Sequence, residues 1–260
     1  MDEVRLHLAA FAAALKAKLE YRADFAVGVV TSMALQFAAL SLLFVVFANT
    51  ESLQGWSARE VVFLFGATAI CLGLSELCFN HIWMLPQYVV AGELDRLLTY
   101  PVHTLSFFLV TRPELHAFGN LFTGGVFVTA ALLSANAPWY AWLLTPFWCV
   151  LGALTYTSML VVFGSLSFKL VGPYSHQLFV PHHLLQATRY PLTIYPRWLR
   201  YLLLVGVPVG AFHFFPASFV FGKTHVVAAV FAPWGIALVA VFLARGAWRL
   251  GLRSYESTGS

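Results

Sequence analysis

The residues of this sequence best suited to acid–base chemistry lie inside long apolar runs. Glu76 is the one acid set deep in such a run, and Asn80 and His81 follow it four and five residues later. His116 and Asn120 stand near the start of the next run, where a similar depth is expected. A charged carboxylate at this depth costs about 2.5 kcal/mol or more, so Glu76 needs a partner or a proton. These five residues are candidates for a translocation path, or for a hydrogen-bond network between helices.

Two kinds of enzyme can be weighed against the same residues. An intramembrane enzyme would take its acid and base from Glu76, His81 and His116, but no nucleophile motif accompanies them. A nucleotide hydrolase would need a phosphate loop, and the nearest match is residues 217–224, which ends in Gly-Lys-Thr. Its first glycine is replaced by Ala217 and bulky apolar residues follow, so it is not expected to wrap a phosphate. No enzyme activity is expected of this chain.

Histidines and cysteines raise the question of a metal centre. His182 and His183 are adjacent, so on a helix they point to different faces, and no carboxylate or cysteine lies near them or His176. The cysteines form no CxxC pair and no zinc spacing. They are Cys71, Cys78 and Cys149. We therefore expect no metal site and no cofactor in this chain.

Composition decides which elements must position these side chains. The chain is 60% hydrophobic and 10% charged, whereas a soluble domain is roughly 25% charged. Its net charge of +4 comes from residues scattered at the ends of apolar runs, which does not indicate nucleic-acid binding. The 260 residues suit one membrane domain of about six helices, since each crossing needs about 20 residues.

Hydropathy marks five crossings plainly. They cover residues 25–47, 61–85, 114–134, 139–163 and 226–244. Lys16, Lys18 and Arg22 precede the first crossing, and Arg245, Arg249 and Arg253 follow the last. The positive-inside rule then predicts that both termini, including the tail 245–260, are cytoplasmic and that the number of crossings is even.

The stretch between residues 164 and 223 allows two interpretations. Hydropathy alone favours 199–221 as the fifth crossing, with 164–198 as a cytoplasmic loop. That segment contains Pro208 and Pro216 with two glycines, which is more typical of two short broken helices. The alternative crossing, 166–187, contains Lys169 and three histidines and would have to face protein or a wet cavity.

Residues 1–24 predict an amphipathic helix rather than a cleavable signal, because charges interrupt every window in which an apolar signal core would lie. Its apolar residues recur at helical spacing. They are Val4, Leu8, Phe11, Leu15 and Leu19. The helix is expected to lie in the membrane interface or to pack on the protein surface.

A short charged segment interrupts the long loop at 86–113. Gly92 can open a helix and Pro101 cannot continue one, so about two turns fit between them. Its remaining functional candidates fall into an apolar face and a charged set, with the acids in the first turn. The apolar residues are Leu94, Leu97 and Leu98, and the charged ones are Glu93, Asp95 and Arg96. It is expected to be cytoplasmic and to contact something outside the membrane.

Three motifs in this order resemble those of the ABC-2 type permeases, in particular an uncharacterised bacterial subfamily of about 260 residues encoded beside a separate ATPase. They are the GxLDxLLxxP segment at 92–101, the run from Tyr190-Pro191 to Ile194-Tyr195-Pro196-Arg197, and the tail Tyr255-x-Ser-Thr-Gly. The resemblance covers nearly the whole chain. It implies six crossings, a cytoplasmic coupling helix within 86–113, and a re-entrant helix pair at 196–221 before the last crossing. It makes 166–187 the fifth crossing.

The same resemblance implies partners and a function. The chain would be the permease subunit of an exporter or flippase in the bacterial inner membrane, pairing with a second permease and with two ATPase subunits. ATP and Mg would bind only the ATPase. The many aromatic residues suit an amphipathic or lipid-like cargo, although aromatic belts at the two interfaces explain them as well. A passive channel or assembly subunit is the alternative.

Overall fold

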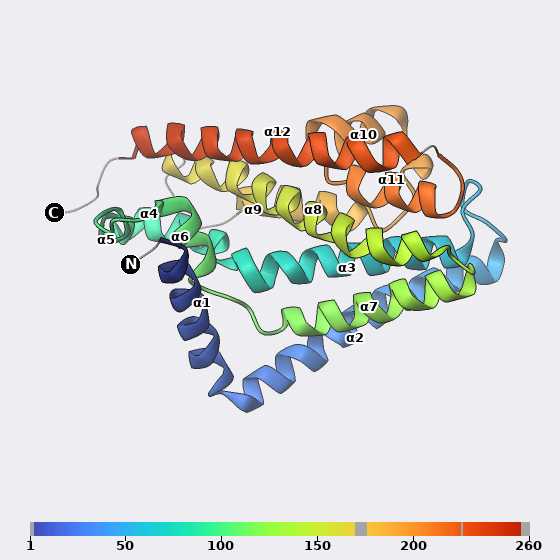
Figure 1. Ribbon diagram of the computed structural model, residues 1–260, viewed down its shortest axis with the longest axis horizontal. Helices are drawn as coiled ribbons and strands as arrows, with labels where there is room; N and C mark the ends of the chain where they lie inside the picture. The colour runs from blue at the N-terminus through green and yellow to red at the C-terminus, as the bar shows by residue number, and fades with distance from the viewer. Residues whose placement is uncertain (1–2, 170–175, 225, 256–260) are drawn as a thin grey trace.

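The computed structural model describes residues 3–169, 176–224 and 226–255, and the regular elements in these ranges are all helices (Figure 1). Five of them are long and apolar enough to cross a membrane: α2 (Arg22–Asn49), α3 (Ala58–Phe79), α7 (Ala117–Ser134), α8 (Trp139–Gly164) and α12 (Val226–Arg253). A sixth is added if one bent helix pair counts as a single crossing. The predicted all-helical membrane fold is confirmed at this level.

Shorter helices connect the long ones. They are α1 (Glu3–Leu19), η1 (Asn80–Met84), α4 (Leu85–Val90), α5 (Leu94–Leu98), α6 (Thr104–Val110), η2 (Ser165–Phe168), α9 (His176–Ala187), η3 (Leu192–Ile194), α10 (Arg197–Tyr201), η4 (Leu202–Gly206) and α11 (Ala211–Val220). We call the end of the bundle that holds α5 and the last turn of α12 the terminal end. The opposite end, with the loops before α3 and α8, is the far end (Figure 1).

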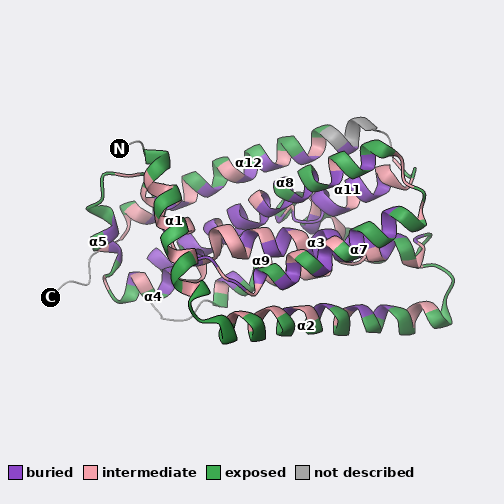
Figure 2. Ribbon diagram, turned by 60° about the horizontal axis from the view of Figure 1, so that its bottom comes forward, coloured by how far each residue is buried: buried purple, intermediate pink, exposed green. Residues whose placement is uncertain are grey.

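The bundle has an inner and an outer set of helices. Within their most apolar stretches, 67% of the α3 residues and 72% of the α8 residues are buried, against 22% for α2 and 28% for α12. Helices α2 and α12 therefore lie at opposite margins, as Figure 1 shows, and present apolar side chains outward. Figure 2 shows α2 exposed along almost its whole outer side. Such faces suit lipid, since no water-soluble fold could leave them uncovered.

Helices α3 and α7 approach closely because glycines face each other across the contact. A Cβ added at Gly124 would lie 2.7 Å from the Gly66 carbonyl oxygen, and one added at Gly66 would lie 2.8 Å from the Gly124 carbonyl oxygen. Small residues let two backbones approach in lipid, where dispersion contacts replace the hydrophobic effect as the main attraction between helices. This contact fixes α7 on the central helix.

The far end is closed by Lys223. Its Nζ donates to the Gly55 carbonyl oxygen at 2.6 Å, lies 3.1 Å from Glu60 Oε2, and stands over the ring of the buried Trp56. The Gly-Lys-Thr that resembles part of a phosphate loop is thus the turn after α11, with Gly222 at φ +70° and its lysine bound to the loop before α3. The start of α12 consequently lies at the far end.

The stretch between α8 and α12 carries the chain from the terminal end to the far end, so it makes one net crossing. Helix α9 begins beside the end of α8, where Leu178 packs against Gly164. It then runs back along α8, where Tyr156 Oη lies 3.0 Å from His182 Nδ1. Its 12 residues reach about 18 Å, less than a membrane core of ~30 Å. Residues 170–175 of the predicted crossing 166–187 lie outside the described residues.

A bent pair follows. The segments 197–206 and 211–220 meet at 104°. Residues 204–208 lie beside Met159 and Phe163, near the terminal end of α8, whereas α11 rises from Cys71 at mid-helix to Phe63 near the far end. The break holds Pro208, and Pro216 lies inside α11. The ring of Pro208 and the backbone of Gly210 already supply the turn.

Two further prolines start helices. Pro191 precedes η3 and Pro196 precedes α10, both in extended conformations compatible with a fixed φ. Arg197 is therefore the first residue of α10 and is exposed. The neighbouring Trp198 and Tyr201 are each 68% exposed, a composition typical of a membrane interface.

Helix α1 lies across the bundle axis at the terminal end and touches α6 (Figure 1). His7 Nε2 lies 3.0 Å from Ser106 Oγ, and Glu3 Oε1 accepts the His103 N–H. No residue of α1 is buried, and Val4 and Leu8 remain exposed. Its first turns therefore rest on α6, while much of the predicted apolar stripe is left uncovered.

Adjacent glycines on α7 provide a test of the packing. Gly124→Leu should destabilise the protein by about 1–3 kcal/mol, because the new side chain meets the α3 backbone. Gly125→Leu is the matched control, since a Cβ there has no heavy atom within 4 Å. The midpoint of thermal unfolding in detergent should fall for the first variant only. Equal midpoints would contradict the close helix contact.

Candidate functional site

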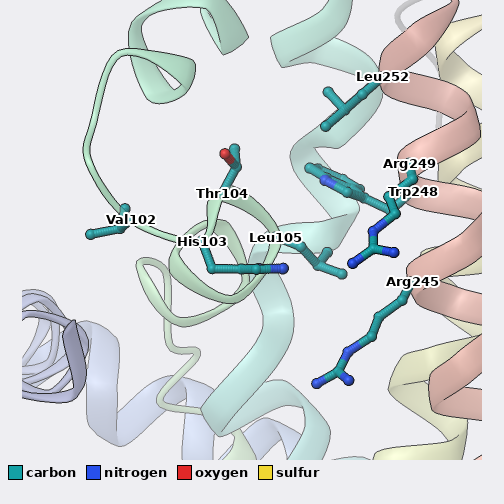
Figure 3. A pocket seen from close by; sticks show the side chains of 8 residues that line it. All are labelled: Val102, His103, Thr104, Leu105, Arg245, Trp248, Arg249 and Leu252. Carbon is teal, nitrogen blue, oxygen red and sulfur yellow. The ribbon is translucent and has the colours of Figure 1, made fainter.

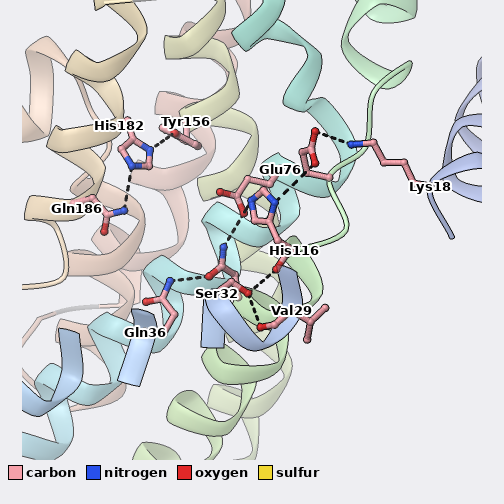
Figure 4. A network of polar contacts seen from close by, with 11 residues as sticks. Lys18, Val29, Ser32, Gln36, Glu76, His116, Tyr156, His182 and Gln186 are labelled. Atoms are coloured by element: carbon pink, nitrogen blue, oxygen red, sulfur yellow. Dashed lines mark hydrogen bonds and ion pairs between the residues drawn. The ribbon is translucent and has the colours of Figure 1, made fainter. Parts of the chain in front are cut away.

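Three of the five polar candidates, Glu76, His116 and Asn120, meet in one hydrogen-bond network where α2, α3 and α7 come together. Asn120 Nδ2 donates to Glu76 Oε2 at 2.7 Å, and Gln36 Nε2 donates to Asn120 Oδ1 at 2.8 Å (Figure 4). Arg189, just after α9, donates from Nη2 to Gln36 Oε1 at 2.9 Å. His116 Nε2 lies 3.4 Å from the same Glu76 oxygen. Three helices and the segment after α9 are thus linked in one chain of contacts that ends at the Glu76 carboxylate.

The network continues to the terminal side of the bundle. Glu114 Oε1 lies 2.7 Å from Lys18 Nζ in an ion pair, and the Glu114 backbone N–H donates to the Glu76 carbonyl oxygen. The His116 carbonyl oxygen accepts the Ser32 hydroxyl from α2. The carboxylates of Glu76 and Glu114 therefore belong to one series of polar contacts, which also contains the cations Lys18 and Arg189. Such a series satisfies most of its own hydrogen bonds, which is the condition for polar groups at membrane depth.

The guanidinium group of Arg189 is not fully hydrogen-bonded among the described residues. Its guanidinium lies 5.4 Å from the centre of the Phe65 ring, and its Nε is buried with no hydrogen-bond partner among the described residues. A second polar group lies close by, in which Tyr156, His182 and Gln186 form a short hydrogen-bonded row (Figure 4). Arg189 Nε can therefore donate one more hydrogen bond within the network.

Two predicted members are absent from the network. His81 is stacked on Phe108 at 4.1 Å, and its Nδ1 lies 2.9 Å from the Phe108 carbonyl oxygen and 2.6 Å from Thr111 Oγ1. Asn80 and His81 belong to η1, where the turn tightens after α3, and the His81 ring lies against α6 rather than beside Glu76. An acid–base set of Glu76, His81 and His116 is therefore not assembled.

Gln36, Ser32 and Arg189 were not among the sequence candidates. A signal for the first two exists, because Ser32 and Gln36 are polar residues one turn apart in the first apolar run, and a polar stripe in a crossing faces protein. They share the buried side of α2 with Leu40 and Leu43. Arg189 gave no such signal, since only the path of α9 brings it to α2.

The short charged segment forms α5, with one change from the expected pattern. Gly92 has φ +70° and ends α4 in the left-handed conformation that closes many helices, so it stops one helix before the next starts. Leu94 and Leu97 are buried, but Leu98 is 42% exposed. By its i, i+4 spacing Leu98 lies on the same side of the helix as Leu94, but at the edge of that side which the membrane domain leaves uncovered.

The charged residues of this segment also divide. Glu93 and Arg96 are exposed, as is Pro101 beyond the helix end. Asp95 is half-buried and lies near Tyr255 in the chain's own tail. Burial raises the pKa of Tyr255, and the nearby Asp95 carboxylate raises it further. The remainder of the tail motif, 256–260, lies outside the described residues. Glu93, Arg96 and Leu98 are thus the exposed residues of α5 and its N-cap, and we call this set the outward face of α5.

Behind this face, α5 is fixed to two long helices. Leu94 and Leu97 belong to a buried cluster that contains Phe108 of α6, Phe168 after α8, and Trp248 of α12. The Trp248 ring lies 5.4 Å from Phe168 and 6.0 Å from Phe108, centre to centre. The same buried cluster thus joins α5 to the terminal ends of α8 and α12.

The role of Asn120 as the link between helices can be tested by its removal. Asn120→Ala should cost about 1–3 kcal/mol of stability, because Gln36 and Glu76 each lose a partner. Asn49→Ala is the control, since the Asn49 amide bonds only within its own helix at an exposed site. A double-mutant cycle with Gln36→Ala, measured by unfolding in detergent, should give a coupling of at least about 0.5 kcal/mol. Additive effects would contradict the network.

Comparison with known proteins gives a match to one family model. The family model described as ABC-2 family transporter protein matches residues 33–259, which includes α5, α12 and the part of the polar network from Gln36 to Arg189. No match was found among the curated proteins or among the solved structures. A multi-pass helical membrane domain with a family match over most of its length leads to one conclusion: the chain belongs to the ABC-2 family of transporter proteins.

Proposed function

We propose that this chain is the permease subunit of an ATP-driven exporter or flippase, and that a separate ATPase subunit drives it through α5. The observation that carries the proposal is the division of α5 into two faces. Leu94 and Leu97 are buried in the membrane domain, while Leu98 and the flanking charges are presented outward. ABC-2 membrane proteins work with ABC ATPases in general. An exposed leucine beside charged residues suits the groove of such a partner.

The mechanism divides the work between the subunits. ATP and Mg bind the ATPase, and its movement displaces α5 together with the ends of α8 and α12 to which the buried cluster joins it. Because one permease has one coupling segment, we further propose a pair of permeases, of this chain or a sibling, on two ATPase subunits. Amphipathic or lipid-like cargo fits the apolar outer helices.

The polar network supplies a candidate path within the membrane domain. Helix α2 is held mainly along one stripe, where Gln36 meets Asn120 and Ser32 meets the His116 carbonyl oxygen. Separation of α2 from α7 would expose Glu76, His116 and Asn120 together along one seam. Their hydrogen bonds to one another stabilise the closed state, and cargo or water replaces them in the open state.

We also propose the orientation. The terminal end is cytoplasmic in the bacterial inner membrane, because Lys16, Lys18 and the arginines of the α12 end gather there. The bent pair is re-entrant from the outer side, which the exposed Trp198 and Tyr201 support. In this arrangement α9 and the extended residues after it complete the fifth crossing, and Arg197 lies near the outer surface.

The coupling face is tested at Leu98. Leu98→Asp should lower the transport-coupled ATPase rate of the reconstituted complex at least about tenfold, because burying a leucine is worth about 1.5–3 kcal/mol and a carboxylate resists burial. Insertion should not change, since Leu98 contacts the outside. Leu133→Asp is the control, as this exposed leucine lies at the far end of α7. Unchanged coupling in Leu98→Asp would exclude α5 as the ATPase contact.

The orientation of the bent pair is tested at Arg197. A cysteine placed there, in a chain whose three native cysteines are replaced, should react with an impermeant thiol reagent added to intact cells. Cysteines at Glu51, in the loop before α3, and at Thr99, beside α5, are the outer and inner references. Labelling at position 197 only after the cells are opened would show that 199–221 is a plain crossing and contradict the re-entrant pair.

A further inference from the structure

A basic cavity lies at the terminal end between α6 and α12, away from both the polar network and the outward face of α5 (Figure 3). Its volume is about 270 Å³. The residues that line it are Val102, His103, Thr104, Leu105, Arg245, Trp248, Arg249 and Leu252. Figure 3 shows the guanidinium groups of Arg245 and Arg249 directed from α12 towards α6, with the His103 ring directed towards them.

The two arginines have no carboxylate partner within the described part of the chain. Both are exposed, and no ion pair joins either of them to an acid there. The nearby Glu3 is already engaged, since its Oε1 accepts the His103 backbone N–H at 2.6 Å. Trp248 between them is 2% exposed and packed against Phe168, so the cavity has a fixed floor. The cavity therefore has two free cations and offers them to an anion.

A second cavity continues from the first towards the middle of the bundle. Its volume is about 230 Å³, and it shares His103, Leu105 and Arg245 with the basic cavity. Val241, one turn before Arg245, lines only this second cavity, whereas Arg249, one turn after it, lines only the first. The basic part is thus nearer the end of the bundle, and the second part lies about 6 Å deeper, at 1.5 Å per residue.

The walls of the deeper cavity are apolar in effect. Leucines and valines from α6, α8 and α12 line it together with Phe79 and Ala244. The three hydroxyl groups present are already used, because Thr157 Oγ1 lies 2.8 Å from Ser75 Oγ, Ser158 donates to the Leu154 carbonyl oxygen, and Ser106 donates to the His103 carbonyl oxygen. The groove thus offers an occupant surface contact with little need for hydrogen bonds.

We propose that the two cavities form one binding site for an anionic phospholipid, with its phosphate between Arg245 and Arg249 and an acyl chain in the deeper groove. Arginine binds phosphate through charge-assisted hydrogen bonds, and anionic lipids concentrate at the basic ends of membrane helices. The positive-inside rule accounts for arginines at this end, but not for their facing a cavity that opens into an apolar groove. The proposal does not depend on the transport function.

The charge requirement is tested with delipidated protein in a neutral detergent. Retention of dioleoyl phosphatidylglycerol is compared with that of dioleoyl phosphatidylcholine by native mass spectrometry. The unmodified chain should prefer the anionic lipid, and the double variant Arg245→Gln with Arg249→Gln should lower its affinity at least about tenfold. Arg253→Gln is the matched control, because this exposed arginine ends the same helix and lines neither cavity. Equal losses in both would mean diffuse attraction and overturn the site.

The acyl requirement is tested separately from the charge. Val241→Trp should fill the groove and weaken binding of the anionic lipid at least about fivefold while both arginines remain, since the acyl chain loses the apolar surface against which it is buried. Leu238→Trp is the control, as Leu238 is 67% exposed on the same helix and lies outside the groove. An unchanged affinity in Val241→Trp would overturn the assignment of the groove.

The source of the anion is decided by competition. Inorganic phosphate at millimolar concentration should displace little of the bound phosphatidylglycerol, because it lacks the acyl contacts. Displacement at concentrations comparable with the lipid would identify a plain phosphate site and overturn the lipid assignment. Circular dichroism and elution volume of each variant confirm that the arginine and valine replacements leave the helices intact.

Discussion

The interior of a membrane provides no water for a charged group, and Glu76 makes that constraint decisive for this protein. Its carboxylate lies near the end of the central helix and must be satisfied by protein atoms. Asn120 and His116 of α7 meet it directly, and Gln36 of α2 and Arg189 after α9 join through Asn120. Elements far apart in the sequence are thereby held in register by one acid. The close glycine contact between α3 and α7 allows the partners to come that near.

The terminal end of α12 combines two roles on one face. Trp248 is the floor of the basic cavity and belongs to the buried cluster that contains Leu94 and Leu97, and Arg245 and Arg249 line the same cavity. A lipid held by those arginines would therefore contact the same helix end that the buried cluster joins to α5.

The stretch from α8 to α12 shows how a crossing is made without a single long helix. The chain runs towards the far end in α9, returns towards Met159 and Phe163 near the terminal end of α8, and runs towards the far end again in α11. Irregular backbone at this depth is tolerated because protein surrounds it. Arg200 donates to the carbonyl oxygens of Leu192 and Thr193, and the Tyr195 hydroxyl donates to that of Ala187. Each half-helix alone is too short to span the membrane, so their mutual packing replaces length.

Hydropathy alone determined the membrane class, the five long helices and the place of α5, because a run of about 20 apolar residues has few other stable environments. The motifs at 92–101 and 190–197 determined the family. Tertiary structure decided which polar residues meet. Glu76 joins Asn120 but not His81, since the turn tightens at η1 and the His81 ring lies against α6. It also decided that Leu97 rather than Leu98 faces the core, because a helix period places both beside Leu94 and only packing selects one. Arg189 and the cavity at Arg245 have no local signature, because both arise where segments distant in sequence are brought together.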